Sequence, residues 1–382
     1  MDTLTLLERL IAFDTTSRNP NRDLIHWVAD LLRDAGAEVT LIPDESGGKA
    51  NLYATLGPTD MPGVALSGHT DVVPVDGQNW TKPPFELTQE NGNLYGRGTC
   101  DMKGFVAAAL SAALRAPTLK TPLHLALSYD EEIGCIGVRS LIDMLSNAPI
   151  KPRFCIVGEP TSMQVATGHK GKMAARVTCH GVEGHSALAP FATNAIYMAT
   201  DLITAIRDIQ TRTEAEGPRD GDYDVPYTTL HVGTINAGTA LNIVPNRAEF
   251  LFEIRSVAED DPDSLLQDIR AAATQIAAAT GAPEAWIEIT PTANTYPGLA
   301  TAPDADVVSF VKALAGGAND TIKVAFGTEG GLFSDVAGIP TVICGPGSMA
   351  QGHKPDEFVS LDQLNQCDAM MDRLLARLEQ GL

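Results

Sequence analysis

The chain has 382 residues, of which 44% are hydrophobic and 20% are charged, so it has the composition of a globular protein but is long for a single core. Its formal net charge of −21 argues against nucleic-acid binding, because phosphate contacts need clustered lysines and arginines. No apolar run approaches the ~20 residues that cross a bilayer, and the N-terminus lacks the basic stretch of a signal peptide, so we expect no membrane partner. Six cysteines without a CxxC pair predict reduced thiols and a cytoplasmic location.

Strand and helix patterns alternate along the first 171 residues. Helical spacing of apolar residues predicts helices at the start of the chain, in NRDLIHWVADLLRDAGAEV up to Gly36, and in GFVAAALSAALRA. Short apolar bursts predict strands in NLYATLG, VALSGH, LHLALSYDEE and RFCIVGEP. This alternation is typical of an α/β sandwich whose sheet is at least partly parallel.

The pattern changes at residues 172–291. There the order strand, helix, strand, strand, helix, strand predicts an α+β ferredoxin-like domain. The α/β pattern then returns in residues 292–382. We therefore expect a discontinuous catalytic domain, residues 1–171 and 292–382, with a second domain inserted at 172–291. A small sheet covered on one face leaves an edge exposed, and pairing with a second chain is one way to cover it.

Five short motifs place a histidine or a carboxylate beside glycine or proline, at the end of an expected strand or in a turn. They are GHTDVV (68–73), GRGTCDMKG (96–104), YDEEIG (129–134), VGEPT (157–161) and GHKPDE (352–357). Taken singly, each has an ordinary explanation, such as a helix N-cap for Asp101 or a surface position for His353. Taken together they indicate a site, because ligands bind beyond the carboxyl ends of strands in open α/β sheets.

The residue types in these motifs suit two metal ions. Zinc takes about four ligands, among which imidazole and carboxylate are common, and paired ions lie ~3.5–4 Å apart. We expect Asp101 to bridge the two ions. The other ligands are predicted as one pair for each ion: His69 with Glu159, and Glu132 with His353.

Two acids remain for other roles. Glu131 is the candidate general base, because it stands next to a ligand and points differently. Asp71 shares a strand face with His69 and is expected to accept the other ring N–H of that histidine.

The five motifs, in this order, resemble those of the co-catalytic zinc aminoacylase and carboxypeptidase family. The resemblance covers nearly the whole chain. It implies a zinc-exopeptidase-like α/β sandwich with an inserted ferredoxin-like dimerisation domain, two zinc ions (cobalt and manganese share such sites) and a homodimer. It also implies a small-molecule substrate, an N-acyl amino acid whose amide bond is hydrolysed, and the same role for each residue named above.

The stretches GRGTCDMKGF, GEPT with GHKGK, and FGTEGG most resemble the branch of this family that converts N-acetyl-L-ornithine to L-ornithine and acetate in arginine biosynthesis. The desuccinylase branch carries arginines near the position of Lys170, where they hold a second substrate carboxylate. This chain has the candidate substrate contact Lys170 there, which disfavours a desuccinylase. The resemblance also implies that His185 reaches from the partner subunit to stabilise an oxyanion. Asn242 resembles a substrate contact of the family. Arg255, at the end of an expected strand, is either a surface charge or a clamp on the substrate α-carboxylate, which the two-pronged guanidinium matches.

Thr328 and Glu329 are expected in a substrate-side loop. Glu329 is a candidate partner for an ornithine ammonium, although a solvated loop acid fits the pattern equally well. Three alternatives stay open at the level of function. The first is a desuccinylase, a broader N-acyl-amino-acid hydrolase or a dipeptidase on the same scaffold. The second is a non-catalytic metal- or amino-acid-binding homodimer. The third is a purely structural homodimer.

Overall fold

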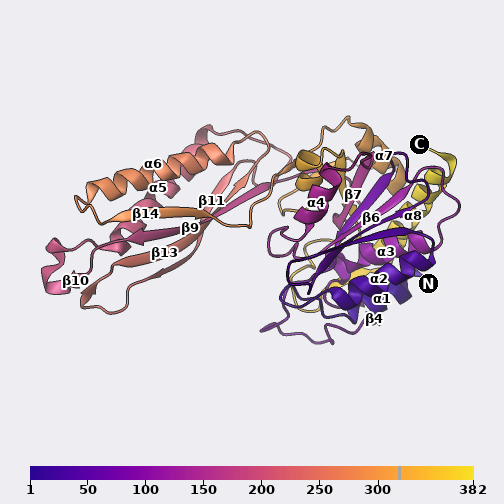
Figure 1. Ribbon diagram of the computed structural model, residues 1–382, viewed down its shortest axis with the longest axis horizontal. Helices are drawn as coiled ribbons and strands as arrows, with labels where there is room; N and C mark the ends of the chain where they lie inside the picture. The colour runs from indigo at the N-terminus through magenta and orange to yellow at the C-terminus, as the bar shows by residue number, and fades with distance from the viewer. Residues whose placement is uncertain (317–319) are drawn as a thin grey trace. The chain divides into compact units, whose positions relative to one another are not determined.

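The computed structural model describes residues 1–316 and 320–382, which form two compact units (Figure 1). The large unit contains Met1–His169 and Leu299–Leu382, and the small unit contains Lys170–Gly298. The small unit thus begins two residues earlier and ends seven residues later than the insert expected at 172–291. The added segment stays with the small unit because its backbone pairs there. Thr292 N–H donates to Ala174 O at 2.8 Å, and Tyr296 N–H donates to Lys172 O at 2.9 Å.

The large unit is built on a nine-stranded mixed sheet. Its strand order is β1-β2-β6-β3-β7-β17-β8-β15, and β16 also pairs with β8. The four central strands β6, β3, β7 and β17 run parallel, so their carboxyl ends share one edge of the sheet. The strands are β1 (Glu38–Pro43), β2 (Ala50–Leu56), β3 (Val64–His69), β6 (Leu123–Ser128), β7 (Phe154–Pro160), β8 (Ala166–His169), β15 (Leu299–Ala300), β16 (Ile322–Val324) and β17 (Thr341–Gly345).

Helices complete the core of the large unit. They are α1 (Thr3–Ile11), α2 (Arg22–Asp34), α3 (Gly104–Leu114), α4 (Val138–Ser146), α7 (Asp306–Ala315) and α8 (Leu361–Gln380). Helix α3 is buried along its length apart from its last residue, and its small side chains let α1 and α8 pack closely against it. The first and last segments of the chain are therefore interleaved, as the purple α3 and yellow α8 show in Figure 1.

A small sheet and two irregular helical segments bring together parts of the chain that are distant in sequence. The sheet β18-β5-β4 joins residues 88–95 to the strand that precedes α8. The sequence did not predict any of these three strands. Two single-turn segments of irregular helix, η1 and η3, precede α3 and β17. The bounds are β4 (Thr88–Glu90), β5 (Asn93–Tyr95), η1 (Thr99–Lys103), η3 (Leu332–Val336) and β18 (Phe358–Ser360).

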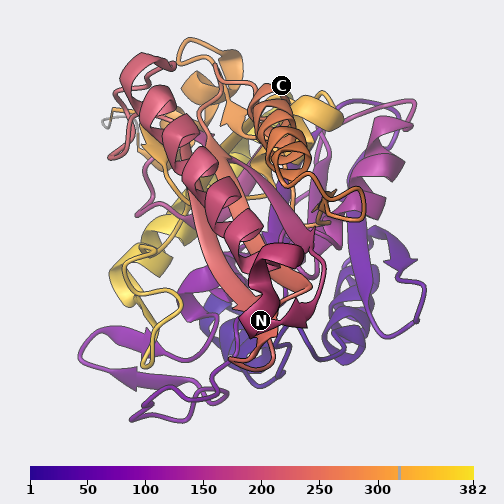
Figure 2. The same cartoon turned by 90° about the vertical axis from the view of Figure 1, so that its left-hand side faces the viewer.

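The small unit has the ferredoxin-like order expected from the sequence. Its four strands form an antiparallel sheet in the order β11-β13-β9-β14. Helices α5 and α6 lie side by side along one face of that sheet, as Figure 2 shows, over a separate apolar core. The elements are β9 (Gly171–His180), β10 (Gly184–His185), η2 (Ser186–Phe191), α5 (Ala195–Glu216), β11 (Thr229–Ala237), β12 (Ile243–Val244), β13 (Arg247–Ser256), α6 (Pro262–Ala279) and β14 (Trp286–Pro291).

The predicted fold class is confirmed: an α/β domain with a mixed sheet, interrupted by an α+β domain. Among the described residues, no helix has both the length and the apolar character that a membrane span requires.

Candidate metal centre

The parallel strands bring the candidate ligands to one edge of the large sheet. His69 is the last residue of β3, and Glu159 is the sixth residue of β7. Glu131 and Glu132 follow β6 in a short loop. Asp101 lies in η1, where its φ of −122° and ψ of 92° depart from helical values and turn the chain into α3. These side chains lie together because parallel strands that end at one edge carry their terminal side chains to it.

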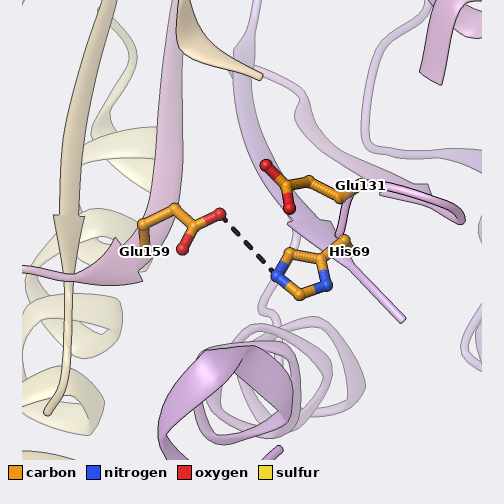
Figure 3. Close-up of side chains that lie close together, drawn as sticks. All are labelled: His69, Glu131 and Glu159. Carbon is orange, nitrogen blue, oxygen red and sulfur yellow. Dashed lines mark ion pairs between the residues drawn. The ribbon is translucent and has the colours of Figure 1, made fainter. Parts of the chain in front are cut away.

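The imidazole of His69 lies among carboxylates. Its Nε2 is 3.0 Å from Asp101 Oδ1 and 3.7 Å from Glu159 Oε1. Figure 3 shows the Glu131 and Glu159 carboxylates close to this ring, with a dashed line marking the contact of Glu159 with it. One ligand atom from each of His69, Glu131 and Glu159 lies within 4.8 Å of the others, and the same holds for His69, Asp101 and Glu132. These are distances from which small adjustments bring several donor atoms onto one cation.

A second histidine, His353, contacts Asp101 and also Glu132. His353 Nε2 lies 2.9 Å from Glu132 Oε2 and 3.2 Å from Asp101 Oδ2. Asp101 thus meets His69 with one oxygen and His353 with the other. This is the arrangement that a carboxylate shared between two cations requires.

The charges of the cluster explain why a cation suits it. Burial disfavours the ionised form of carboxylates and raises the pKa of Glu132 to about 7, with the nearby Asp101 charge adding to the effect. Burial likewise raises the pKa of Glu131 and Glu159 well above the usual range. Burial opposes ionisation of Asp101 too, but hydrogen bonds from the two imidazoles outweigh it and hold its pKa low. The pKa of His353 rises to about 10 through hydrogen bonds to Asp101 and Glu132.

The donor set passes a direct test of fit to a metal. Glu132 Oε1 is buried and has no hydrogen-bond partner among the residues that the structure describes. An orphaned carboxylate oxygen is costly unless something positive meets it. Imidazole nitrogens and carboxylate oxygens are the donors that zinc, cobalt and manganese take. The cluster therefore fits a divalent metal ion.

Asp71 holds the cluster differently from the sequence-based prediction. The Nδ1 of His69 is 2.9 Å from the backbone carbonyl of Asp71 and 3.5 Å from its carboxylate. That carboxylate accepts hydrogen bonds from the Ser17 hydroxyl at 2.7 Å and from the Glu131 backbone N–H at 3.1 Å. Asp71 therefore orients His69 chiefly through its main chain and ties down the acidic loop with its side chain.

Thr328 and Glu329 lie in the loop between β16 and η3. Both are buried, with Thr328 Oγ1 accepting from Gly330 N–H at 2.9 Å. The Glu329 carboxylate accepts from the hydroxyls of Ser67, at 3.1 Å, and Ser128. Burial raises the pKa of Glu329 to about 7. These two strand hydroxyls satisfy the buried carboxylate, so Glu329 is not a solvated loop acid, and its contact with an ornithine ammonium stays a prediction.

The remaining candidates belong to the small unit. His185 and Asn242 are neighbours there: β10 pairs His185 with Ile243, and Ser186 N–H donates to Asn242 O at 3.1 Å. Arg255 Nη1 donates to the Tyr296 hydroxyl at 2.9 Å.

Lys170 also lies in the small unit, and its Nζ donates to Tyr227 O at 2.6 Å. The structure thus groups the metal ligands in one unit and the predicted substrate contacts Arg255, Asn242 and Lys170 in the other.

Three residues close to the ligands were missed in the sequence: Gln78, Arg97 and Glu357. Arg97 and Glu357 stand inside the quoted motifs GRGTCDMKG and GHKPDE. Two opposite charges beside glycine-rich turns were the available signal. Nothing in either motif alone indicates that they pair.

A mixed α/β sheet that carries buried histidines and carboxylates at the carboxyl edge of its parallel strands has the architecture of a metallohydrolase. Residues 65–377 match the model of Peptidase family M20/M25/M40, and the chain belongs to this family of metal-dependent hydrolases.

Curated relatives match almost end to end. The acetylornithine deacetylase of Myxococcus xanthus is 36% identical, over 97% of this chain and 96% of its own. That of Aliivibrio salmonicida (strain LFI1238) is 32% identical, over 95% of this chain and 93% of its own.

Solved structures show the same fold at lower identity. The M20 family metallo-carboxypeptidase Sso-CP2 from Sulfolobus solfataricus superposes with a TM-score of 0.79 at 20% identity, covering 100% of both chains. The YXEP protein of Bacillus subtilis, a dinuclear metal binding peptidase from the M20 family, has a TM-score of 0.70 at 15% identity, covering 100% of this chain and 98% of its own.

Proposed function

We propose that this protein hydrolyses the amide bond of N-acetyl-L-ornithine, giving L-ornithine and acetate in arginine biosynthesis, with two zinc ions as cofactors. The names of the curated relatives support the substrate. The observation that carries the mechanism is the pair of histidines that meet the two oxygens of Asp101. That contact pattern supports our proposal of two metal positions that share one carboxylate.

The ligands divide as the contacts suggest. His69 and Glu159 would hold one ion, Glu132 and His353 the other, with Asp101 on both. Cobalt or manganese would suit the same donors. When bound, such ions supply Lewis-acid polarisation of the amide carbonyl and make a water molecule more acidic.

Glu131 is the residue that we assign to proton transfer. The water oxygen attacks the acyl carbon while Glu131 takes the water proton on its carboxylate. The C–N bond then breaks, and Glu131 returns that proton to the amine nitrogen as acetate leaves. Asp71 fixes the Glu131 backbone, and the Cys135 thiol donates to Glu131 Oε1 at 3.3 Å. These two contacts hold the carboxylate in one orientation, which proton transfer requires.

The small unit would supply the substrate contacts. Arg255 has the fork geometry that binds a carboxylate with two hydrogen bonds, and we assign it to the α-carboxylate of the substrate. Asn242 is assigned to a further polar contact. Lys170 adds positive charge near Arg255, where a desuccinylase would carry arginine.

A homodimer is part of the proposal. Around His185, the small unit exposes large apolar side chains: Leu188 is 57% exposed, Phe191 87% and Leu241 fully. Such a group on a surface marks an interaction site, and a second copy would bury it. We assign His185 to the oxyanion in the partner's site. Phe191→Asp should give a monomer by light scattering and abolish turnover, and a fully active monomer would contradict the assignment.

We place the enzyme in the cytoplasm, where thiols stay reduced. All six cysteines are buried and unpaired, which supports this location.

Steady-state hydrolysis of three substrates tests the choice of substrate. We expect fast cleavage of N-acetyl-L-ornithine and at least about 100-fold lower kcat/KM for N-succinyl-L,L-diaminopimelate and a simple dipeptide. Preferred cleavage of the succinyl compound would overturn the substrate assignment and the reading of Lys170. Preferred cleavage of the dipeptide would make the protein a dipeptidase.

A further inference from the structure

A chain of polar contacts with a buried centre joins the two loops that carry Asp101 and His353. Its centre is an ion pair between Arg97 Nη1 and Glu357 Oε2 at 2.6 Å, in which both side chains are 1% exposed. Arg97 lies in the turn before η1, and Glu357 lies just before β18. The proton-transfer and metal-binding roles assigned above use neither residue.

At one end of these polar contacts, Glu357 binds the backbone of Asp101. Glu357 Oε1 accepts hydrogen bonds from the backbone N–H groups of Cys100 at 2.9 Å and Asp101 at 3.0 Å. The η1 segment has irregular dihedral angles, so its own backbone bonding does not determine where Asp101 points. The Glu357 carboxylate replaces that missing constraint.

The other end reaches the backbone of His353. Arg97 Nη2 donates to Gln78 Oε1 at 2.6 Å, and Gln78 Nε2 donates to the His353 carbonyl at 3.0 Å. Trp80 Nε1 donates to the same Gln78 oxygen at 3.0 Å, and its ring lies 5.0 Å from the Arg97 guanidinium. These contacts orient the Gln78 amide so that its N–H group points at His353.

The energetics indicate a positioning role. A buried ion pair gains little net stability, because desolvation of both charges offsets their attraction. What such a pair does well is define geometry, since each hydrogen bond in it is costly to break. Here the geometry that it defines is the separation between the loop of Asp101 and the loop of His353.

We propose that Glu357, Arg97 and Gln78 form a positioning chain that sets His353 against Asp101 and so completes the second metal position. This inference rests on the proposed two-ion function. It predicts that a break in the chain weakens the second ion selectively, while the ion at His69 and Glu159 is retained.

Gln78 is the place to break the chain, because it is only half-buried and its replacement leaves the buried ion pair in place. Gln78→Ala removes both links. Gln78→Glu keeps an oxygen acceptor for Arg97 and Trp80 but loses the amide donor to His353. Gln366→Ala, on the exposed face of α8, is the matched control.

The measurement is calorimetric titration of metal-free protein with Zn²⁺, together with the Co²⁺ absorption spectrum and the unfolding midpoint of the metal-free form. We expect two binding events in the wild type and in Gln366→Ala. In both Gln78 variants the second event should weaken by about 10–100-fold, the usual effect of losing a partner that orients a ligand. The first event and the metal-free unfolding midpoint should be unchanged.

The experiment distinguishes a wrong positioning chain from a wrong two-ion function. If the wild type binds two ions and both Gln78 variants match it, the positioning chain is wrong and the two-ion function stands. If both events weaken equally, or the metal-free protein loses stability, Gln78 acts on the fold as a whole and the inference is overturned. A wild type that binds one ion contradicts the two-ion function and the inference with it.

Discussion

Replacement of Glu131 by glutamine separates proton transfer from metal binding. The amide has the shape of the carboxylate and keeps an oxygen for the Cys135 thiol, and the backbone N–H that Asp71 holds is untouched. The five proposed ligands are unchanged. The variant therefore loses only a proton acceptor, and general-base catalysis of this kind is worth roughly 10²–10⁴ in rate, or about 3–5 kcal/mol in the barrier.

The assay is amine release from N-acetyl-L-ornithine at saturating substrate, with metal content measured on the same sample by atomic emission. We expect kcat to fall by about 10²–10⁴-fold at unchanged metal content. Asp143→Asn, on the exposed surface of α4, is the control and should stay within about twofold of the wild type. An E131Q enzyme that keeps half of the wild-type kcat would refute the role of Glu131.

Three further predictions concern packing, pH and substrate binding. A Cβ at Gly158 would lie 1.9 Å from the Phe105 ring, so Gly158→Ala should lower the free energy of unfolding by about 1–3 kcal/mol in urea titrations. Adding Phe105→Leu should recover part of the loss. A G158A protein with the unfolding free energy of the wild type would contradict this packing. Burial lowers the pKa of His124 to about 4, against about 6.5 in an unfolded chain, so its contribution to stability is present above pH 6.5 and is lost as the pH falls toward 4. Between pH 7 and pH 5 the free energy of unfolding of His124→Gln should therefore fall by about 2 kcal/mol less than that of the wild type. Parallel curves of unfolding free energy against pH for the two proteins would show that this residue does not titrate as described. Arg255→Lys should raise KM for N-acetyl-L-ornithine about tenfold with little change in kcat, because lysine cannot form the two parallel hydrogen bonds, whereas an unchanged KM would remove Arg255 from the substrate site.

The parts of the site that were predictable lie where regular strands end. His69 and Glu159 stand at the carboxyl ends of β3 and β7, and both strands are recognisable as uninterrupted apolar runs. Parallel pairing then brings those ends together whatever the details of the loops. The ferredoxin-like order of the small unit was predictable for a similar reason, since each of its elements has a clear period.

The parts that were not predictable depend on irregular backbone. Glu329 follows a short strand and looks like a loop acid, yet it is buried because hydroxyls on two other strands, Ser67 and Ser128, receive it. Asp71 was expected to meet His69 through its carboxylate, but its carbonyl is nearer. Such choices are made by partners that are distant in sequence, and local pattern contains no information about them.

The ion pair between Arg97 and Glu357 was not predictable for the same reason, because 260 positions separate the two residues. Each residue taken alone resembles an ordinary charged residue in a turn. Only the interleaving of the first and last segments around α3 and α8 brings them into one interior.

The central claim is that two metal ions held by this cluster make the protein a deacetylase. It is tested most directly by titrating zinc into chelator-treated protein while N-acetyl-L-ornithine hydrolysis is followed. We predict negligible activity without metal and a rise that reaches its plateau at two zinc ions per chain. Full activity in the chelated protein, or no hydrolysis of this substrate after zinc is added, would contradict the account.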